Sequence, residues 1–295
     1  MKIVNYLQGN LSRVGVVEDG NLVDLSEPFS RYGLRVDSLD SMLELGLFDK
    51  IDDALRESSI SIKLSKVKLL PPVIHPEKIM LAAVNYYSHE REQGASRPGL
   101  PYLFTKFRNA LTGPYDDLLL PVASEKMDYE GELAVIIGKK GKYIKKTEAM
   151  DHVLGFTVAD DVSFRDLQFP SGWPNVLNPY GQNWVKGKSL DYAFPLGPWV
   201  ITADEIDDPY SLNIRTTVNG EVKQDGNTSD IIFSIEELIE YASNGITLMP
   251  GDVISTGTPH GVAAFNQERF LSEGDIVEVT VSKVGYIRNR VKKEQ

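Results

Sequence analysis

Cysteine is absent from the 295 residues of this chain. Its absence excludes disulfide bonds, thiolate nucleophiles and cysteine-ligated zinc, and it predicts a location in the reducing cytoplasm. Histidine is scarce, with four residues, so we do not expect a metal site built mainly from imidazole. No apolar run reaches the length of a signal-peptide core or of a membrane-spanning helix, which predicts a protein with no membrane partner.

Positive charge is also in deficit. The formal net charge is −11, and no stripe of lysine and arginine interleaved with aromatic residues offsets it, which argues against a nucleic-acid partner. The hydrophobic content of 42% and the charged content of 25% are ordinary for a soluble enzyme with a sizeable core. Any function must therefore be sought in the motifs.

The distribution of apolar residues predicts a β-rich α+β fold in two domains. Residues 1–72 combine a hairpin signal, Asp-Gly-Asn at 19–21 between two apolar runs, with helical spacing over 38–55. Paired prolines at 71–72 mark the boundary. The larger domain, 73–295, consists mainly of strands, which are predicted at 78–83, 132–137, 155–159, 199–202, 212–218, 253–256 and 276–281.

Two further signals concern the larger domain. A helix is predicted over 235–243, with Ser234 as its N-cap and Glu237 completing a capping box. Asn219-Gly220 predicts a hairpin turn. Residues 169–184 contain three prolines and three asparagines and predict a long loop, which is typical of a functional lid or a partner-facing surface.

Two carboxylates one residue apart, Glu130 and Glu132, open the apolar run 133–137. On a strand they share one face, and because both faces of this run are apolar we expect the strand to be buried. Two buried anions repel each other and lose hydration, and a hard cation with oxygen ligands, such as Mg²⁺ or Ca²⁺, would compensate them. The alternative is a frayed strand start with both glutamates in water.

Asp160 and Asp161 follow the strand predicted at 155–159. Asp161 would supply a third carboxylate and complete an oxygen-only ligand set with open positions for water and substrate. The commoner role of such residues is to cap the following turn or helix. A Gly/Thr-rich turn at 257–259 would offer N–H groups and a hydroxyl to an anion, or would be a tight turn only.

A helix is predicted to start near Asn85, with Ser88 as its cap. It places His89 and Glu92 three residues apart and therefore on one helical face. A histidine oriented by a carboxylate forms a general-base pair. The alternative is a solvated pair on the surface.

These segments together resemble the fumarylacetoacetate hydrolase superfamily, over about residues 78–291. Each motif is short, but all occur in the family's order. They are Asn85-Tyr86 followed by His89 and Glu92, the runs 128–133, 161–168, 187–189, 195–198 and 219–221, and the segment 250–259. Ala83-Val84, Phe164 and Ala263 depart from the family pattern. Phe164 and the proline-rich insertion 169–184 lie near the expected pocket and leave the substrate open.

The resemblance implies a mixed β-sandwich roll in the larger domain, usually as a homodimer. It implies that Glu130, Glu132 and Asp161 bind Mg²⁺, with Mn²⁺ or Ca²⁺ as alternatives. It also implies that His89 and Glu92 activate a water molecule.

The remaining site residues are likewise implied by the resemblance. Lys188 would steady a developing oxyanion, Arg165 and Gln168 would contact the substrate, and Thr258 would hold the substrate carboxylate. The function expected is a Mg²⁺-dependent hydrolase that cleaves a C–C bond of a small 2,4-dioxo acid, of the acylpyruvate or fumarylacetoacetate type, through an enolate.

Other outcomes of the same enolate chemistry stay open. They are isomerisation of the 2-hydroxyhepta-2,4-diene-1,7-dioate type, dehydration of a 2-keto-3-deoxy acid, and decarboxylation of the oxaloacetate type. A non-catalytic binding protein on the same scaffold is a further alternative. The presence of His89, Glu92 and Lys188 together argues against it, because simple binding needs no water-activating pair.

Overall fold

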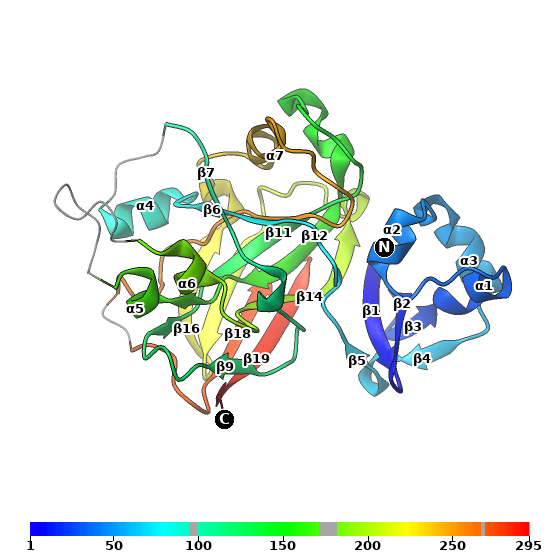
Figure 1. Cartoon of the computed structure of the whole chain (residues 1–295), viewed down its shortest axis with the longest axis horizontal. Helices are drawn as coiled ribbons and strands as arrows, with labels where there is room; N and C mark the ends of the chain where they lie inside the picture. Colours follow the sequence, from blue (N-terminus) through cyan, green and yellow to red (C-terminus); the bar gives the residue numbers. More distant parts are fainter. Residues whose placement is uncertain (95–98, 171–181, 267–268, 295) are drawn as a thin grey trace.

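The computed structural model describes residues 1–94, 99–170, 182–266 and 269–294 (Figure 1). Its largest sheet has twelve strands, in the order β4-β3-β2-β1-β14-β12-β11-β17-β6-β7, with β5 added to β1 and β8 to β14. The strands of this sheet are β1 (Lys2–Gln8), β2 (Leu11–Glu18), β3 (Asn21–Asp24), β4 (Ser61–Lys63), β5 (Lys68–Leu69), β6 (Ile79–Ala83), β7 (Tyr102–Thr105), β8 (Leu111–Thr112), β11 (Gly131–Ile137), β12 (Val153–Asp160), β14 (Phe194–Thr202) and β17 (Val253–Ser255).

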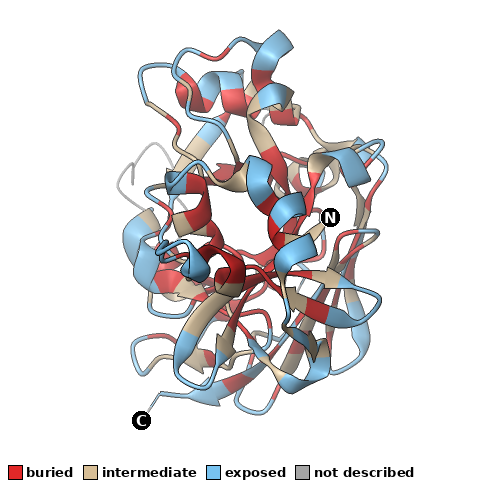
Figure 2. Cartoon of the chain, turned by 90° about the vertical axis from the view of Figure 1, so that its right-hand side faces the viewer, coloured by how far each residue is buried: buried red, intermediate tan, exposed pale blue. Residues whose placement is uncertain are grey.

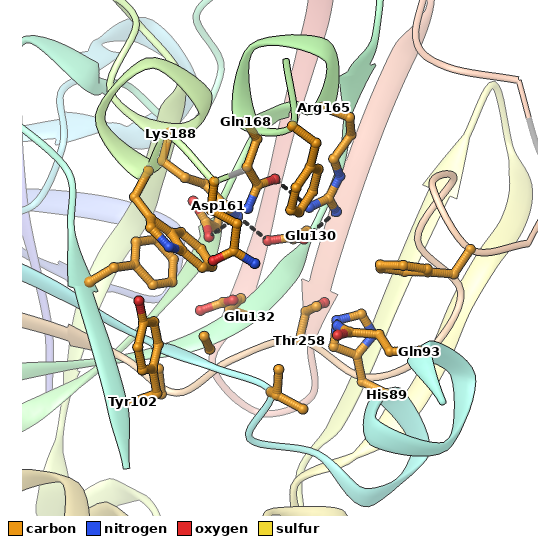
Figure 3. Close-up of a pocket in the computed structure, with 18 residues that line it drawn as sticks. His89, Gln93, Tyr102, Glu130, Glu132, Asp161, Arg165, Gln168, Lys188 and Thr258 are labelled. Atoms are coloured by element: carbon orange, nitrogen blue, oxygen red, sulfur yellow. Dashed lines mark hydrogen bonds and ion pairs between the residues drawn. The ribbon is translucent and has the colours of Figure 1, made fainter. Parts of the chain in front are cut away.

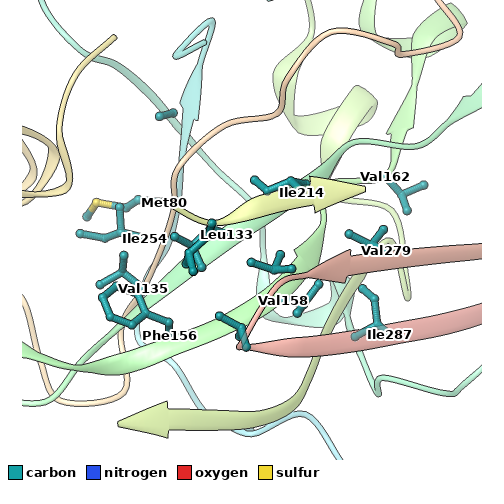
Figure 4. Packing of buried hydrophobic residues seen from close by; sticks show 14 of the residues in the cluster. Met80, Leu133, Val135, Phe156, Val158, Val162, Ile214, Ile254, Val279 and Ile287 are labelled. Atoms are coloured by element: carbon teal, nitrogen blue, oxygen red, sulfur yellow. The ribbon is translucent and has the colours of Figure 1, made fainter. Parts of the chain in front are cut away.

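A second sheet of five strands, in the order β16-β15-β18-β19-β9, packs against the large one. Leu133 of β11 and Val158 of β12 meet Ile214, Val279 and Ile287 across the interface (Figure 4). The predicted fold class, a mixed sandwich-like α+β fold, is confirmed. The strands of this sheet are β9 (Leu118–Leu120), β15 (Asn213–Val218), β16 (Glu221–Asn227), β18 (Ile276–Val281) and β19 (Gly285–Lys293), while β10 (Met127–Asp128) and β13 (Ser163–Phe164) form a separate pair.

The N-terminal strands extend the large sheet, because β1 pairs with β14, with Lys2 opposite Ile201. The predicted hairpin is confirmed as β2 and β3. The stretch with helical spacing contains α2 (Leu39–Glu44) and the start of α3 (Ile51–Glu57), and a further helix, α1 (Ser26–Arg31), precedes them. These helices mix buried and exposed residues (Figure 2), and β1 is buried from Ile3 to Tyr6. The division into domains 1–72 and 73–295 stays a prediction.

Strand β11 is buried along its whole length, as predicted from its two apolar faces. Leu133, Val135 and Ile137 point into the cluster between the two sheets. Ala134 and Ile136 point into a second cluster on the opposite face, which includes residues of the N-terminal helices. Because the strand is enclosed on both sides, the glutamates that begin it, Glu130 and Glu132, are also largely shielded from solvent.

The predicted helix α7 (Ile235–Ser243) is confirmed together with its capping box between Ser234 and Glu237. Asn219-Gly220 joins β15 to β16, as the hairpin signal predicts. Of the loop predicted over 169–184, residues 171–181 lie outside the described residues, and Trp184 begins the short helix α6 (Trp184–Lys188). In the part of the chain that is described, no helix has the length and apolarity needed to span a bilayer.

Candidate active site

One cavity, of about 280 Å³, brings together the predicted site residues from segments far apart in the chain (Figure 3). Its volume lies near the lower end of the ~300–1,000 Å³ typical of small-molecule sites, which suits a small substrate. Glu92 does not line the cavity but supports His89 from behind. The predicted residues that line it are His89, Glu130, Glu132, Asp161, Arg165, Gln168, Lys188 and Thr258.

The three predicted metal ligands converge because β11 pairs with β12, with Gly131 opposite Asp160. The Asp161 N–H donates to the Glu130 carbonyl at 2.9 Å. One carboxylate oxygen from each of Glu130, Glu132 and Asp161 lies within 4.8 Å of the others. All three side chains are buried. The alternatives of a frayed strand start and of a simple cap at Asp161 are therefore wrong.

Lysine 188 lies between two of these carboxylates. Its Nζ is 2.5 Å from both Glu130 Oε2 and Asp161 Oδ2. Burial alone would raise the pKa of Glu130, but the charges of Arg165 and Lys188 hold it well below its usual range. Burial and the charge of Asp161 raise the pKa of Glu132 well above its usual range. Lys188 and Arg165 thus form ion pairs with Glu130, whereas Glu132 has no ion pair among the described residues.

This donor set fits a hard divalent cation. It offers only carboxylate oxygens, which Mg²⁺, Mn²⁺ and Ca²⁺ accept, and three carboxylates face two cationic side chains in the lining. The ammonium of Lys188 already shows that a positive charge is favourable between Glu130 and Asp161. Glu132 keeps its position through Ser255 Oγ and the Gly257 N–H, which both donate to its Oε2.

Arginine 165 is fixed by protein groups on every side. Its Nε donates to Asp128 Oδ2 at 2.8 Å, one terminal nitrogen donates to Gln168 Oε1 at 3.0 Å, and the other donates to Glu130 Oε1. Asp128 is itself held by the N–H of Ala263 at 2.9 Å. Arg165 therefore orients Glu130 and Gln168, and whether it also contacts substrate, as predicted, stays a prediction.

The helix that carries the predicted base is α4 (Tyr87–Gln93). The prediction of Ser88 as its cap is wrong, because Tyr86 occupies the cap position and makes no side-chain cap bond. Asp230, far along the chain, accepts from the Ser88 N–H at 2.7 Å instead. A residue distant in sequence thus anchors the first turn, which no local pattern reveals.

Within α4, His89 Nδ1 lies 2.8 Å from Glu92 Oε2, and both side chains are buried. The alternative of a solvated surface pair is therefore wrong. Burial alone would raise the pKa of Glu92, but hydrogen bonds from His89 and from the Gly261 N–H lower it. An ionised Glu92 requires the proton on Nδ1, so Nε2 is the acceptor nitrogen that faces the cavity. Gln93 Nε2 lies 2.5 Å from it.

The Gly/Thr-rich turn has its polar groups already engaged. The Gly257 N–H donates to Glu132 at 3.1 Å, so the anion that this turn holds is a carboxylate of the protein. The Thr258 hydroxyl donates to the Gly131 carbonyl at 2.9 Å and accepts from Gln224 Nε2 at 2.7 Å. Thr258 lines the cavity, and its predicted role toward the substrate carboxylate stays a prediction.

Sequence reasoning missed two buried charges and an aromatic wall. Lys106 Nζ donates to the carbonyls of Val162, Ala193 and Lys188 and lies 3.0 Å from Asp161 Oδ1. A lone lysine after a strand carries no signal that separates it from a solvated one. Asp128 does carry a signal in the sequence, because it lies two residues before Glu130 and four before Glu132 and so continues their alternation. The cavity wall formed by Tyr102, Phe104 and Trp184 is also absent from the sequence predictions.

Comparisons with known proteins identify the family of this chain. The profile of the fumarylacetoacetate (FAA) hydrolase C-terminal domain matches residues 78–292. Oxaloacetate tautomerase FAHD2A, mitochondrial, of Bos taurus is 47% identical over 228 residues, which are 77% of this chain and 70% of the relative.

Two solved structures align over 100% of this chain and of their own. Fumarylacetoacetate hydrolase from Exiguobacterium antarcticum is 33% identical with a TM-score of 0.85. Maleylpyruvate hydrolase from Sphingobium sp. SYK-6, solved with a manganese(II) ion and pyruvate, is 30% identical with a TM-score of 0.78. With a family profile over most of its length and relatives that share its fold from end to end, the chain belongs to the fumarylacetoacetate hydrolase family.

Proposed function

We propose that this protein is a divalent-cation-dependent hydrolase that cleaves the C–C bond of a small 2,4-dioxo acid. The observation that carries the proposal is the buried pair of His89 and Glu92, whose imidazole lines the same cavity as three convergent carboxylates, with its Nε2 2.5 Å from the Gln93 amide. A binding protein would need the carboxylates but not the pair. Mg²⁺ is the cation proposed, held by Glu130, Glu132 and Asp161. When bound it would supply Lewis-acid stabilisation of the negative charge that develops on the substrate's 2-oxo oxygen.

The protein's own residues would carry out the proton transfers. His89 Nε2 takes a proton from water while the water oxygen bonds to the distal carbonyl carbon, C4. Glu92 keeps the imidazole in the required tautomer and stabilises its protonated form. The C3–C4 bond then breaks, its electron pair passes to C3, and a carboxylic acid leaves. The proton on His89 returns to C3, so that pyruvate is the second product.

Lys188, Arg165 and Gln168 would assist the attack at C4 by binding the substrate and its developing charge. We propose that the Lys188 ammonium donates to the oxygen that gains charge at C4, and that Arg165 and Gln168 bind the substrate from the neighbouring wall. Thr258 would help to bind the substrate carboxylate. Because Lys188 is paired with Glu130 and Asp161, its release from them would accompany cation binding.

A second candidate function is keto–enol tautomerisation of a 2-oxo acid. The Bos taurus relative at 47% identity is named as an oxaloacetate tautomerase, and this observation favours it. Tautomerisation would use the same cation and the same base but no water nucleophile. The homodimer and the cytoplasmic location stay predictions.

Product analysis tests the proposal and separates the two candidates. The purified protein with Mg²⁺ is offered acetylpyruvate, benzoylpyruvate and oxaloacetate, and products are identified by NMR. Hydrolysis predicts pyruvate together with acetate or benzoate. Exchange of the C3 protons with solvent deuterium, without cleavage, would indicate the tautomerase instead. If none of these compounds reacted, both candidates would be ruled out.

A further inference from the structure

We infer that the substrate carries a single carboxylate and a flat, uncharged group at its other end, as an aroylpyruvate or enoylpyruvate does, rather than a second carboxylate. This inference rests on the proposed function and narrows it to a substrate class. It is drawn from the two ends of the cavity, which differ in chemistry.

One end of the cavity is a continuous aromatic wall. The Phe104 and Trp184 rings stack with centroids 4.6 Å apart, and the Tyr102 and Trp184 rings follow at 5.7 Å. The wall begins next to the charged residues, because Lys188 Nζ lies 5.1 Å from the Phe104 centroid. Figure 3 places Tyr102 on the side of the carboxylates opposite His89 and Gln93. Flat π-systems pack well on such rings, and carboxylates do not.

The backbone next to this wall also favours an apolar ligand. Val84 lines the cavity with φ at +52°, in the left-handed region that a β-branched residue rarely adopts. Such a conformation persists only where the surrounding structure imposes it, and it clusters at functional sites. Here it adds an apolar isopropyl group to the lining, beside Ala82 and Ala83.

No free cation is available for a second carboxylate among the described residues of the lining. Arg165 and Lys188 are its only lysine or arginine side chains, and both are buried against carboxylates of the protein. The other polar side chains of the described lining are the amides of Gln93, Gln168 and Gln182, the hydroxyls of Tyr102 and Thr258, the Trp184 indole, and the His89 imidazole, which pairs with Glu92. Lys188, once released from Glu130 and Asp161 by the bound cation, would be engaged with the oxygen at C4. A second carboxylate would therefore find no cationic partner among the described residues, and its desolvation would be costly.

The charge balance leads to the same substrate class. The buried ionic groups in and directly behind the lining are four carboxylates, Asp128, Glu130, Glu132 and Asp161, and three cationic side chains, Lys106, Arg165 and Lys188, so the formal charge is −1. A divalent cation turns this into one positive charge, which one carboxylate of the substrate neutralises. A second carboxylate would restore a buried excess of negative charge.

Binding and turnover together test the inference. Calorimetry with Mg²⁺ compares phenylpyruvate, a monoanion with a flat apolar group, with 2-oxoglutarate, a dianion, and neither has the 4-oxo group needed for cleavage. We expect phenylpyruvate to bind about tenfold more tightly. Trp184→Ala should reduce this preference, because it removes part of the wall. Tyr102→Ala should do the same with less risk to folding, because Tyr102 is 50% exposed. Tyr143→Ala, which removes an aromatic side chain that is 64% exposed and outside the cavity, is the matched control and should leave the preference unchanged.

The outcomes separate this inference from the proposed function. Tighter binding of 2-oxoglutarate, or an unchanged preference in both wall variants, would overturn the substrate class, even if acylpyruvates were cleaved. If no 2-oxo acid bound and none reacted, the proposed function would fall as well. In the turnover assay, benzoylpyruvate should exceed the dicarboxylate fumarylpyruvate in kcat/KM, and the reverse order would again overturn the substrate class alone.

Discussion

Lys106 and Asp161 form a fully buried ion pair, with Nζ 3.0 Å from Oδ1. The same ammonium donates to two backbone carbonyls, that of Val162, which follows Asp161 in the chain, and that of Lys188 itself. One lysine therefore holds in place both the third carboxylate of the cavity and the end of the helix that carries Lys188. The other oxygen of Asp161 faces Lys188, so the carboxylate is bracketed by two cations.

Replacing Lys106 by methionine should destabilise the protein by about 3–5 kcal/mol, because it leaves Asp161 and buried carbonyls without their partner. The free energy of unfolding, from urea denaturation, measures this. Lys68→Met is the matched control. Its ion pair with Asp116 is exposed, and its loss should cost about 0–1 kcal/mol. Equal stabilities of the two variants would contradict a structural role for the Lys106–Asp161 pair.

Glu132→Gln should change stability in opposite directions with and without Mg²⁺. Without metal, the amide replaces a buried carboxyl group whose raised pKa shows that burial disfavours its charged form. The amide can still accept from Ser255 and Gly257, so the variant should melt at a higher temperature than the native protein. With Mg²⁺ and oxalate, an enolate mimic, only the native protein should gain further stability. Thermal-shift assays measure both effects. A variant that still gained stability from Mg²⁺ would exclude Glu132 as a ligand.

His89→Asn should lower kcat by about 10²–10⁴, because proton transfer loses its base, and Mg²⁺ affinity should stay unchanged. Glu92→Gln should give a smaller loss, since the amide can still contact the ring while it no longer favours the required tautomer. Steady-state kinetics and calorimetry with Mg²⁺ provide the two readouts. Native turnover in His89→Asn would remove this residue from the chemistry.

Lys188→Met should lower kcat by about a hundredfold or more, as expected for loss of an oxyanion donor. Mg²⁺ should bind at least as tightly as before, because the ammonium that lies between Glu130 and Asp161 is gone. This combination separates catalysis from metal binding in a single variant. If turnover were unchanged, Lys188 would have no part in the mechanism, and if Mg²⁺ affinity fell sharply, its main role would be to shape the carboxylate cluster.

Acid should weaken the contact between Arg269 and Asp275. Hydrogen bonds from Arg269 and Asn219 lower the pKa of Asp275 to about 2, against about 3.9 in an unfolded chain. A lowered folded-state pKa gives stability that is complete above about pH 4 and is lost as the pH falls toward about 2. Asp275→Asn should cost about 1 kcal/mol near pH 7, since Arg269 is largely exposed, and less near pH 3. A difference that did not narrow in acid would contradict this assignment.

The elements that were predicted correctly are those whose conformation is determined by residues close together in the sequence. The capping box at Ser234 and Glu237, the Asn219-Gly220 turn and the apolar run of β11 each appear within a few residues. The convergence of Glu130, Glu132 and Asp161 on one metal ion was predicted from the resemblance of the ordered motifs to one family. Their spacing in sequence could not have shown it, because β11 and β12 are joined through a separate segment of some fifteen residues, 138–152.

The features that sequence reasoning missed depend on contacts between distant segments. Asp230 accepts from the first turn of α4, and Arg165 pairs with Asp128 and Glu130, which come from another segment of the chain. A lysine that ends up enclosed by carbonyls looks, in the sequence, like any other lysine. Local sequence patterns cannot distinguish a buried lysine from a solvated one, because burial and pairing arise only when strands from different parts of the chain come together.

Composition and motif order by themselves established the absence of cysteine chemistry, the β-rich α+β class, the family and the residues that converge. The tertiary structure alone decided how charge is distributed among them. It placed two lysines on Asp161, engaged Arg165 and Thr258 with protein groups, and set an aromatic wall beside Lys188. Hydrophobic periodicity is a property of short segments, whereas the pairing of buried charges is a property of the packed interior, where each charge must find its partner.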